Sequence, residues 1–200
     1  MSSIVIAGNT SGAITIAAPA EAGLNTLTLP ASTGTVALTS DIPAPVTAVQ
    51  THLTTTSSQS NTANVRTNIS GLNATITPST TSKRIKITIR WNGEHSNSIN
   101  YNQVFGIKRD TTDIGNPAAA GVRPVGMAIV AVNYLSDATS TPDSATYTYI
   151  DSPATTSATT YHATYLNKVA ANLYNQRTVN DTNNTDSERL TSNIILEEID

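Results

Sequence analysis

Along the first forty residues, short runs of alternating apolar and small polar residues are separated by turns that contain Gly or Pro. Alternation with a period of two places one set of side chains on one face of a β-strand. The Val, Ile and Thr residues of these runs suit a pleated, half-buried surface. The pattern therefore predicts four short strands, at residues 3–7, 13–17, 24–29 and 34–39.

One face of these strands is apolar but small. Its residues, which we expect to serve in anchoring and assembly, are Ile4, Ile6, Ile14, Ile16, Leu27, Leu29, Val36 and Leu38. Because mostly Ala and Thr lie between them, burial cannot offset about 1–2 kcal/mol of backbone entropy per residue. Another molecule must cover this face, and further copies of the same chain around a shared axis are the simplest choice. We interpret residues 1–42 as an N-terminal β-ribbon attachment and assembly segment.

A break follows this segment. Pro43 and Pro45 fix φ and restrict the residues before them, which favours a hinge. The spacing of Val49 and Leu53 is compatible with a short helix, but a Thr- and Ser-rich stretch then ends the pattern. The sequence predicts a Pro/Thr/Ser-rich linker at residues 43–65.

Residues 66–200 are predicted to form one β-sandwich domain with a jelly-roll-like fold, which makes the fold class all-β. Short strand candidates alternate with loops rich in Asn, Asp, Gly, Pro and Ser, as in sandwiches. The candidates are residues 74–77, 84–91, 103–109, 126–134, 145–150, 160–166, 172–177 and 194–198.

Two of these candidates have a clear pattern. In residues 84–91, the positions expected to face inward are Ile85, Ile87, Ile89 and Trp91. Residues 126–134 are almost continuously apolar, which is typical of a central strand that is covered on both faces.

The composition argues against several classes of function. The chain has 200 residues, no Cys, 12% charged and 4% aromatic residues, so candidates for acid–base catalysis are few. A formal net charge of −3 argues against a nucleic acid as the partner. Without Cys, stability must come from packing and oligomerisation. The sequence shows neither a signal peptide nor a long apolar run, so we expect no secretion signal and no membrane insertion.

The N-terminal segment also carries a resemblance. Residues 13–42 include the runs ITIAAPA, NTLTLP and GTVALTSDI. They are similar to a segment near the N-termini of tailed-bacteriophage fibre and other virion-attached proteins. Residues 149–161, 175–180 and 192–199 look like the C-terminal β-sandwich domains of phage fibre-like proteins. The resemblance implies a homotrimeric virion protein, anchored at its N-terminus, with an outward-facing head and no catalytic residues.

Within this class, we expect a non-enzymatic capsid decoration or head-fibre protein that is assembled in the host cytoplasm. Its partners would be further copies of itself and capsid or tail proteins, with a host-surface glycan as an additional candidate. A tail fibre or adaptor that binds a host receptor is the alternative, and a carbohydrate-binding module is an alternative of another class. Tyr101 and Tyr134 are candidates for stacking on a sugar or for packing in an interface.

The histidines give no sign of a metal site or a nucleophile. His52 lies in the predicted linker, His95 in a predicted turn and His162 in a predicted strand. Their spacing fits no metal-ligand pattern, and no zinc-protease, nucleophile-elbow or paired-thiol motif is present. We therefore expect no metal, no cofactor and no catalytic residue.

The acidic residues leave two alternatives to weigh. Glu94, Asp110 and Asp113 flank strand ends, where they are candidates for the carboxylate pair of a glycan-cleaving enzyme or for ordinary turn chemistry. Residues 181–188 have the alternating oxygen ligands of a calcium loop but lack its Gly and its final Glu. We expect a polar loop there.

Overall fold

The computed structural model describes residues 3–7, 13–17, 47–96, 103–119, 121–132 and 139–200. These residues form strands, turns and loops without a helix, so the all-β prediction is confirmed. The chain divides into two compact units, residues 1–44 and 45–200. We call the second unit the head.

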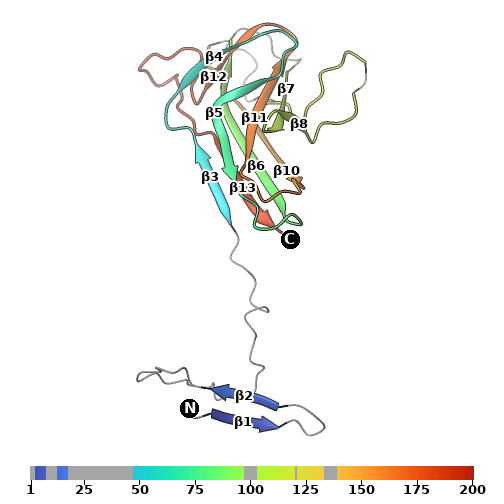
Figure 1. Ribbon diagram of the computed structural model, residues 1–200. Helices are drawn as coiled ribbons and strands as arrows, with labels where there is room; N and C mark the ends of the chain where they lie inside the picture. The colour runs from blue at the N-terminus through green and yellow to red at the C-terminus, as the bar shows by residue number, and fades with distance from the viewer. Residues whose placement is uncertain (1–2, 8–12, 18–46, 97–102, 120, 133–138) are drawn as a thin grey trace. The chain divides into compact units, whose positions relative to one another are not determined.

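In the first unit, β1 (Ser3–Ala7) and β2 (Ala13–Ala17) pair as an antiparallel ribbon (Figure 1). The register places Ile4 opposite Ile16 and Ile6 opposite Ile14. Four of the residues predicted to act in assembly therefore occupy directly paired positions. The other four lie outside the described residues: Leu27, Leu29, Val36 and Leu38.

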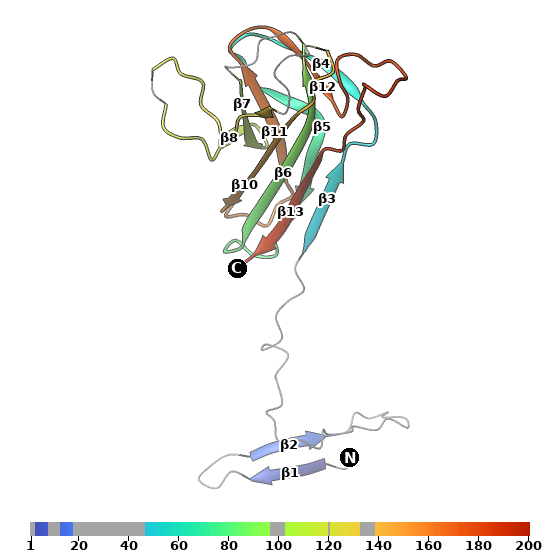
Figure 2. The same cartoon turned by 180° about the vertical axis from the view of Figure 1, so that it is seen from behind.

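The head contains two antiparallel sheets that share one core (Figure 1, Figure 2). The larger sheet has the strand order β3 (Ala48–His52), β13 (Asn193–Ile199), β6 (Arg84–His95), β10 (Asp143–Asp151) and β9 (Ala131–Val132). Two further strands extend it beside the end of β6, namely β12 (Ala171–Asn175) and β4 (Ser57–Asn61). The smaller sheet has the order β5 (Thr67–Ile76), β11 (Thr159–Asn167), β7 (Gln103–Arg109) and β8 (Thr112–Ile114).

Strand β6 is at the centre of the larger sheet, between β10 on one side and β13 and β12 on the other. Its inward-facing residues are the predicted ones, and each is 0% exposed: Ile85, Ile87, Ile89 and Trp91. The smaller sheet completes the core with Ile69, Leu72, Ile76, Phe105, Ile107, Tyr161 and Tyr165. Alternation in β6 thus identified the main contribution of the larger sheet to the core.

The predicted linker at residues 43–65 requires a correction, because it contains two strands of the head. β3 pairs with β13, and Val49 and Leu53 pack against the core, so their spacing does not reflect a helix. β4 consists of polar residues only, and it is held by its pairing with β12. The side chain of Gln59 also bonds the backbone of Asn68 and Ser70 in β5, which links the two sheets.

Residues 126–134 also differ from the prediction, because they do not form a central strand. Ala128 bridges to Phe105 at the edge of the smaller sheet, and β9 pairs with the first residues of β10 in the larger sheet. Ile129 between them is 71% exposed. The apolar run therefore crosses from one sheet to the other at an edge, and residues 133–134 lie outside the described residues.

Candidate functional site

Many of the buried polar side chains of the head lie at one end of it. There β6 ends at His95, β10 begins at Asp143, and the long loop between β12 and β13 starts. The opposite end holds the start of β3, which lies beside the end of β13 (Figure 2). We use the name distal cluster for Glu94 and His95 together with residues 139–143 and 176–192.

Glu94 connects the two loops of the distal cluster. The residue is 2% exposed, and its two carboxylate oxygens accept hydrogen bonds from different loops. One accepts from the backbone N–H of Val179 at 2.6 Å and the other from the hydroxyl of Thr141 at 2.8 Å. A backbone bond from Asn180 to Thr139 at 2.7 Å joins the loops directly. A single carboxylate on a central strand thus positions both loops.

Gln176 connects the base of the longer loop to the sheet. Its φ is 63°, a left-handed conformation that is unusual for a residue other than glycine, and its residue is 5% exposed. Its backbone N–H donates to Asn92 at 2.9 Å, and its carbonyl accepts from Leu190 at 3.0 Å. Its side-chain amide accepts from the N–H of Ser192 at 2.9 Å and donates to the carbonyl of Thr55 at 3.1 Å. Every polar group of this residue is used to close the loop.

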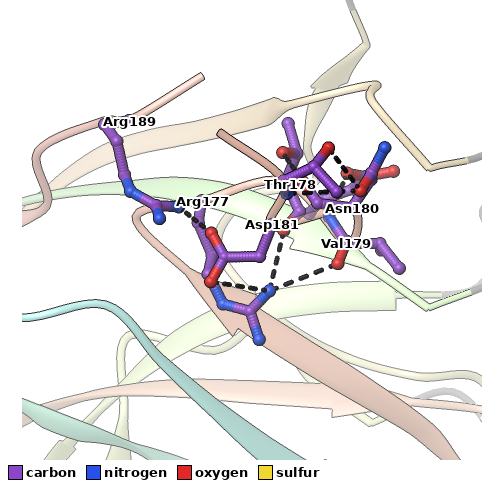
Figure 3. A network of polar contacts seen from close by, with 8 residues as sticks. Arg177, Thr178, Val179, Asn180, Asp181 and Arg189 are labelled. Atoms are coloured by element: carbon purple, nitrogen blue, oxygen red, sulfur yellow. Dashed lines mark hydrogen bonds and ion pairs between the residues drawn. The ribbon is translucent and has the colours of Figure 1, made fainter. Parts of the chain in front are cut away.

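Arg177 and Arg189 lie on either side of Asp181 (Figure 3). The Arg177 guanidinium donates to the carbonyl oxygens of the next two residues at 3.1 and 3.2 Å and lies 3.8 Å from the Asp181 carboxylate. It also stacks over the ring of Tyr174, 4.6 Å from the ring centroid. Arg189 pairs with the other oxygen of Asp181. These contacts stiffen the loop beneath its exposed part.

The longest exposed run of the loop is residues 181–186, which are polar throughout. Asn180 accepts bonds from the N–H and hydroxyl of Thr182, and Asn184 accepts from the N–H of Asp186, so the loop orders its own backbone. The hydroxyl of Ser140 reaches the carbonyl of Asp186 from the neighbouring loop. The chemistry that this surface offers to a partner is hydrogen bonding by amide, hydroxyl and carboxylate groups.

His95 is buried at the edge of this cluster. Its side chain is 3% exposed, and its ring lies 5.2 Å from the rings of both Trp91 and Tyr165. Its Nδ1 lies 3.4 Å from a carboxylate oxygen of Asp143. Burial lowers the pKa of His95 below its ordinary value, although the Asp143 and Glu94 carboxylates act in the opposite direction. Burial therefore favours the neutral form of the ring.

The three histidines lie on different strands. His52 is exposed on β3, and His162 is half-buried on β11, where it stands opposite Lys108. Burial also lowers the pKa of His162. Among the described residues, no group of three His, Cys, Asp or Glu side chains is placed to hold a metal ion.

The three carboxylates weighed as a catalytic pair do not come together. Glu94 belongs to the distal cluster, whereas Asp110 and Asp113 flank the turn between β7 and β8. That turn lies at the other end of the head. Arg109, next to the turn, binds Asp151 at the end of β10, and Asp151 pairs with the start of β6. Asp110 accepts the N–H of Thr160 at 3.0 Å, and Asp113 pairs with an arginine, Arg66, at 3.5 Å. Turn and loop stabilisation accounts for all three.

For the calcium-like loop at residues 181–188, the contacts agree with the polar-loop interpretation. Asp181, its first acidic residue, already has two arginine partners. Tyr101 and Tyr134 lie outside the described residues. Sequence reasoning missed Gln176 and Arg177 as organising residues, because neither belongs to an apolar pattern or a charge cluster.

No family model matches this sequence, and no curated protein matches it. The described residues include no helix that is long and apolar enough to cross a membrane.

Proposed function

We propose that the chain is a non-enzymatic structural protein of a bacteriophage virion, a homotrimer with an N-terminal anchor and a jelly-roll-like head. The observation that carries the proposal is the β1–β2 ribbon, in which Ile4 and Ile6 stand opposite Ile16 and Ile14. Each strand has five residues, and an isolated two-stranded ribbon of this kind is at best marginally stable in water. The ribbon therefore needs a partner, which three-fold assembly and attachment to a particle would supply.

The attachment mechanism is strand pairing. Main-chain hydrogen bonds from the ribbon to a capsid or tail protein would give affinity, and the small Ala, Ser and Thr side chains beside the isoleucines would allow close approach. In the head, the distal cluster lies at the end opposite to the start of β3, where the chain enters. This makes the distal cluster the surface of the head best suited to meet an external partner.

Light scattering on the purified full chain tests the oligomeric state. We expect three times the chain mass of 20.9 kDa. Residues 45–200 alone, which form a compact unit with their own core, show whether the head or the ribbon holds the trimer. A monomeric full chain would contradict the symmetric assembly.

Particle binding tests the anchor. The double variant Ile6→Asp with Ile14→Asp places charges at one paired position of the ribbon and should abolish co-sedimentation with purified phage particles. Thr15→Asp is the matched control, because Thr15 is exposed in the same strand. Antibody labelling of the bound head in electron micrographs then separates a capsid decoration or head fibre from a tail fibre or adaptor.

A carbohydrate-binding module is the second candidate, and one observation favours it. The exposed residues 181–186 offer amide, hydroxyl and carboxylate groups on a loop base fixed by Glu94 and Gln176. A monomer that binds defined glycans on an array, and loses them when Asn183 and Asn184 are replaced by Ala, would support this function over the virion protein.

A further inference from the structure

His95 and Asp143 occupy the points where two strands meet the distal loops. His95 is the last residue of β6 and Asp143 the first residue of β10, and their side chains are 3% and 14% exposed. Around the imidazole stand the aromatic rings of Trp91, Tyr165 and, at 6.4 Å, Phe105. The ring is therefore enclosed by groups that solvate a charge poorly.

The one hydrogen bond of this ring, from Nδ1 to Asp143, leaves its other nitrogen without a partner in the described part of the chain. With Nδ1 donating to Asp143, the other nitrogen, Nε2, is an acceptor, and it is buried with no hydrogen-bond partner among the described residues. Protonation would turn Nε2 into a donor that faces no acceptor in the described part of the chain. A buried N–H of this kind is costly, and more so when the group is charged.

In the described part of the chain, the charged groups around the ring come from two strands. Asp143 from β10 and Glu94 from β6 are the acidic groups that act on it. The other strands present uncharged groups, with Phe105 from β7, Tyr165 from β11 and, paired with His95 in register, Leu173 from β12. Two carboxylates thus favour a proton on His95, and the aromatic enclosure opposes it.

The same residues hold the loops. Glu94, next to His95, bonds the N–H of Val179 in one loop and the hydroxyl of Thr141 in the other. Asp143, the first residue of β10, is two residues from Thr141 in the loop that leads into that strand. A movement of the end of β6 or of the start of β10 that gives a charged His95 ring access to water would therefore shift both loops with it.

We propose that His95 is an acid-sensitive latch, which keeps the distal cluster closed while the ring is neutral and lets it open when the ring is protonated. An opened ring in water binds a proton with the ordinary histidine pKa of about 6.5, and the closed ring binds it more weakly. Acid therefore favours the open form, starting as the pH falls through about 6.5, and the closed form is favoured above it. This inference does not depend on the proposed virion function.

Hydrogen exchange of the full chain between pH 7.5 and 5.0, corrected for the intrinsic pH dependence of exchange, tests the latch. Protection of the amides in residues 139–143 and 176–192 should fall by up to about tenfold per pH unit below about pH 6.5, because opening takes up one proton. His95→Gln should remove this fall. The other two histidines supply matched controls, since His52→Gln and His162→Gln should retain it.

Three outcomes would overturn the proposal. In the first, protection of the loop amides stays constant down to pH 5.0. In the second, it falls as much in His95→Gln as in the wild type, which would assign the effect to carboxylates. In the third, protection of core amides such as those of Ile87 and Tyr161 falls as much as that of the loop amides.

Proton NMR of the histidine rings in the wild-type protein measures their titration directly, so the proposal can be tested even if the His95→Gln protein does not fold. The control variants assign the resonances of His52 and His162, and the remaining one belongs to His95. The proposal requires that ring to remain neutral in the closed protein at pH 6.5. A free titration near pH 6.5 with the loops still protected would contradict it.

Discussion

The two halves of β6 differ in how they are built. In residues 84–89 buried Ile side chains alternate with exposed or half-exposed polar ones, which is the pattern of a strand with one solvated face. In residues 90–95 the alternation stops after Asn92, and Gly93, Glu94 and His95 are all buried in succession. Loops cover the second face of this distal half.

The proximal half therefore contributes mainly to the stability of the head, and the distal half to the positions of the loops. The proximal half contributes apolar burial, which depends on area and is insensitive to small rotations of the groups involved. The distal half contributes hydrogen bonds from buried polar groups, which depend on geometry and become costly when one partner is removed. Changes in the proximal half should therefore lower the free energy of unfolding of the whole head, and changes in the distal half should release loops.

The largest effect is expected in the proximal half. Ile87 is 0% exposed, so Ile87→Ala removes apolar contacts and leaves a cavity, which should lower the free energy of unfolding by about 2–5 kcal/mol. Urea denaturation of the head followed by Trp91 fluorescence measures this change. Thr88→Ala, on the outer face of the same strand, is the matched control and should cost less than about 0.5 kcal/mol. Equal losses of unfolding free energy in both variants would show that burial does not distinguish the inner from the outer face of β6.

A smaller and more local effect is expected at Gln176 in the distal half. Gln176→Ala removes both side-chain hydrogen bonds and keeps the strained φ of 63°, so it should destabilise the head by about 1–3 kcal/mol. Gln176→Gly loses the same bonds but relieves a left-handed conformation that costs about 1–2 kcal/mol, so it should be the milder variant.

Hydrogen exchange would sharpen this comparison. Both Gln176 variants should lose protection at Leu190 and Ser192, whose N–H groups donate to Gln176, before they lose it in the core. If Gln176→Gly were as destabilising as Gln176→Ala, backbone strain would have no part in the effect.

The proximal half and the first two residues of the distal half were predictable from the sequence, and the rest of the distal half was not. Residues 84–91 carry a period-two signal that identified all four inward-facing side chains. The distal end was expected to be a turn, because Gly93 and the polar residues after it resemble one. In the structure Gly93 continues the strand and allows β12 to approach, since a Cβ there would lie 2.0 Å from the carbonyl oxygen of Tyr174.

The remaining errors have a similar cause. β4, Ser57–Asn61, has no apolar residue, and only its partners β12 and β5 make it a strand. The run 126–134 is apolar enough for a central strand, but a sequence does not show that its residues would be divided between two sheet edges. Local patterns report burial on one face, whereas these segments are fixed by contacts with residues far away in the chain.

The smallest effects separate two arginines of the distal cluster that share Asp181. Arg189 is 55% exposed in its side chain and pairs with that carboxylate in solvent, so Arg189→Ala should change the free energy of unfolding by less than about 1 kcal/mol. Arg177 is 15% exposed, donates to two carbonyl oxygens and stacks on Tyr174, so Arg177→Ala should cost more and expose the loop at residues 178–181.

Raising the salt concentration distinguishes the two arginines further. Screening weakens exposed ion pairs more than buried hydrogen bonds. The effect of Arg189→Ala should therefore vanish in 1 M salt, whereas that of Arg177→Ala should largely remain. If both effects vanished together, the loop would be held by its ion pairs alone, and the hydrogen bonds of Arg177 would not distinguish the inner from the outer part of the distal cluster.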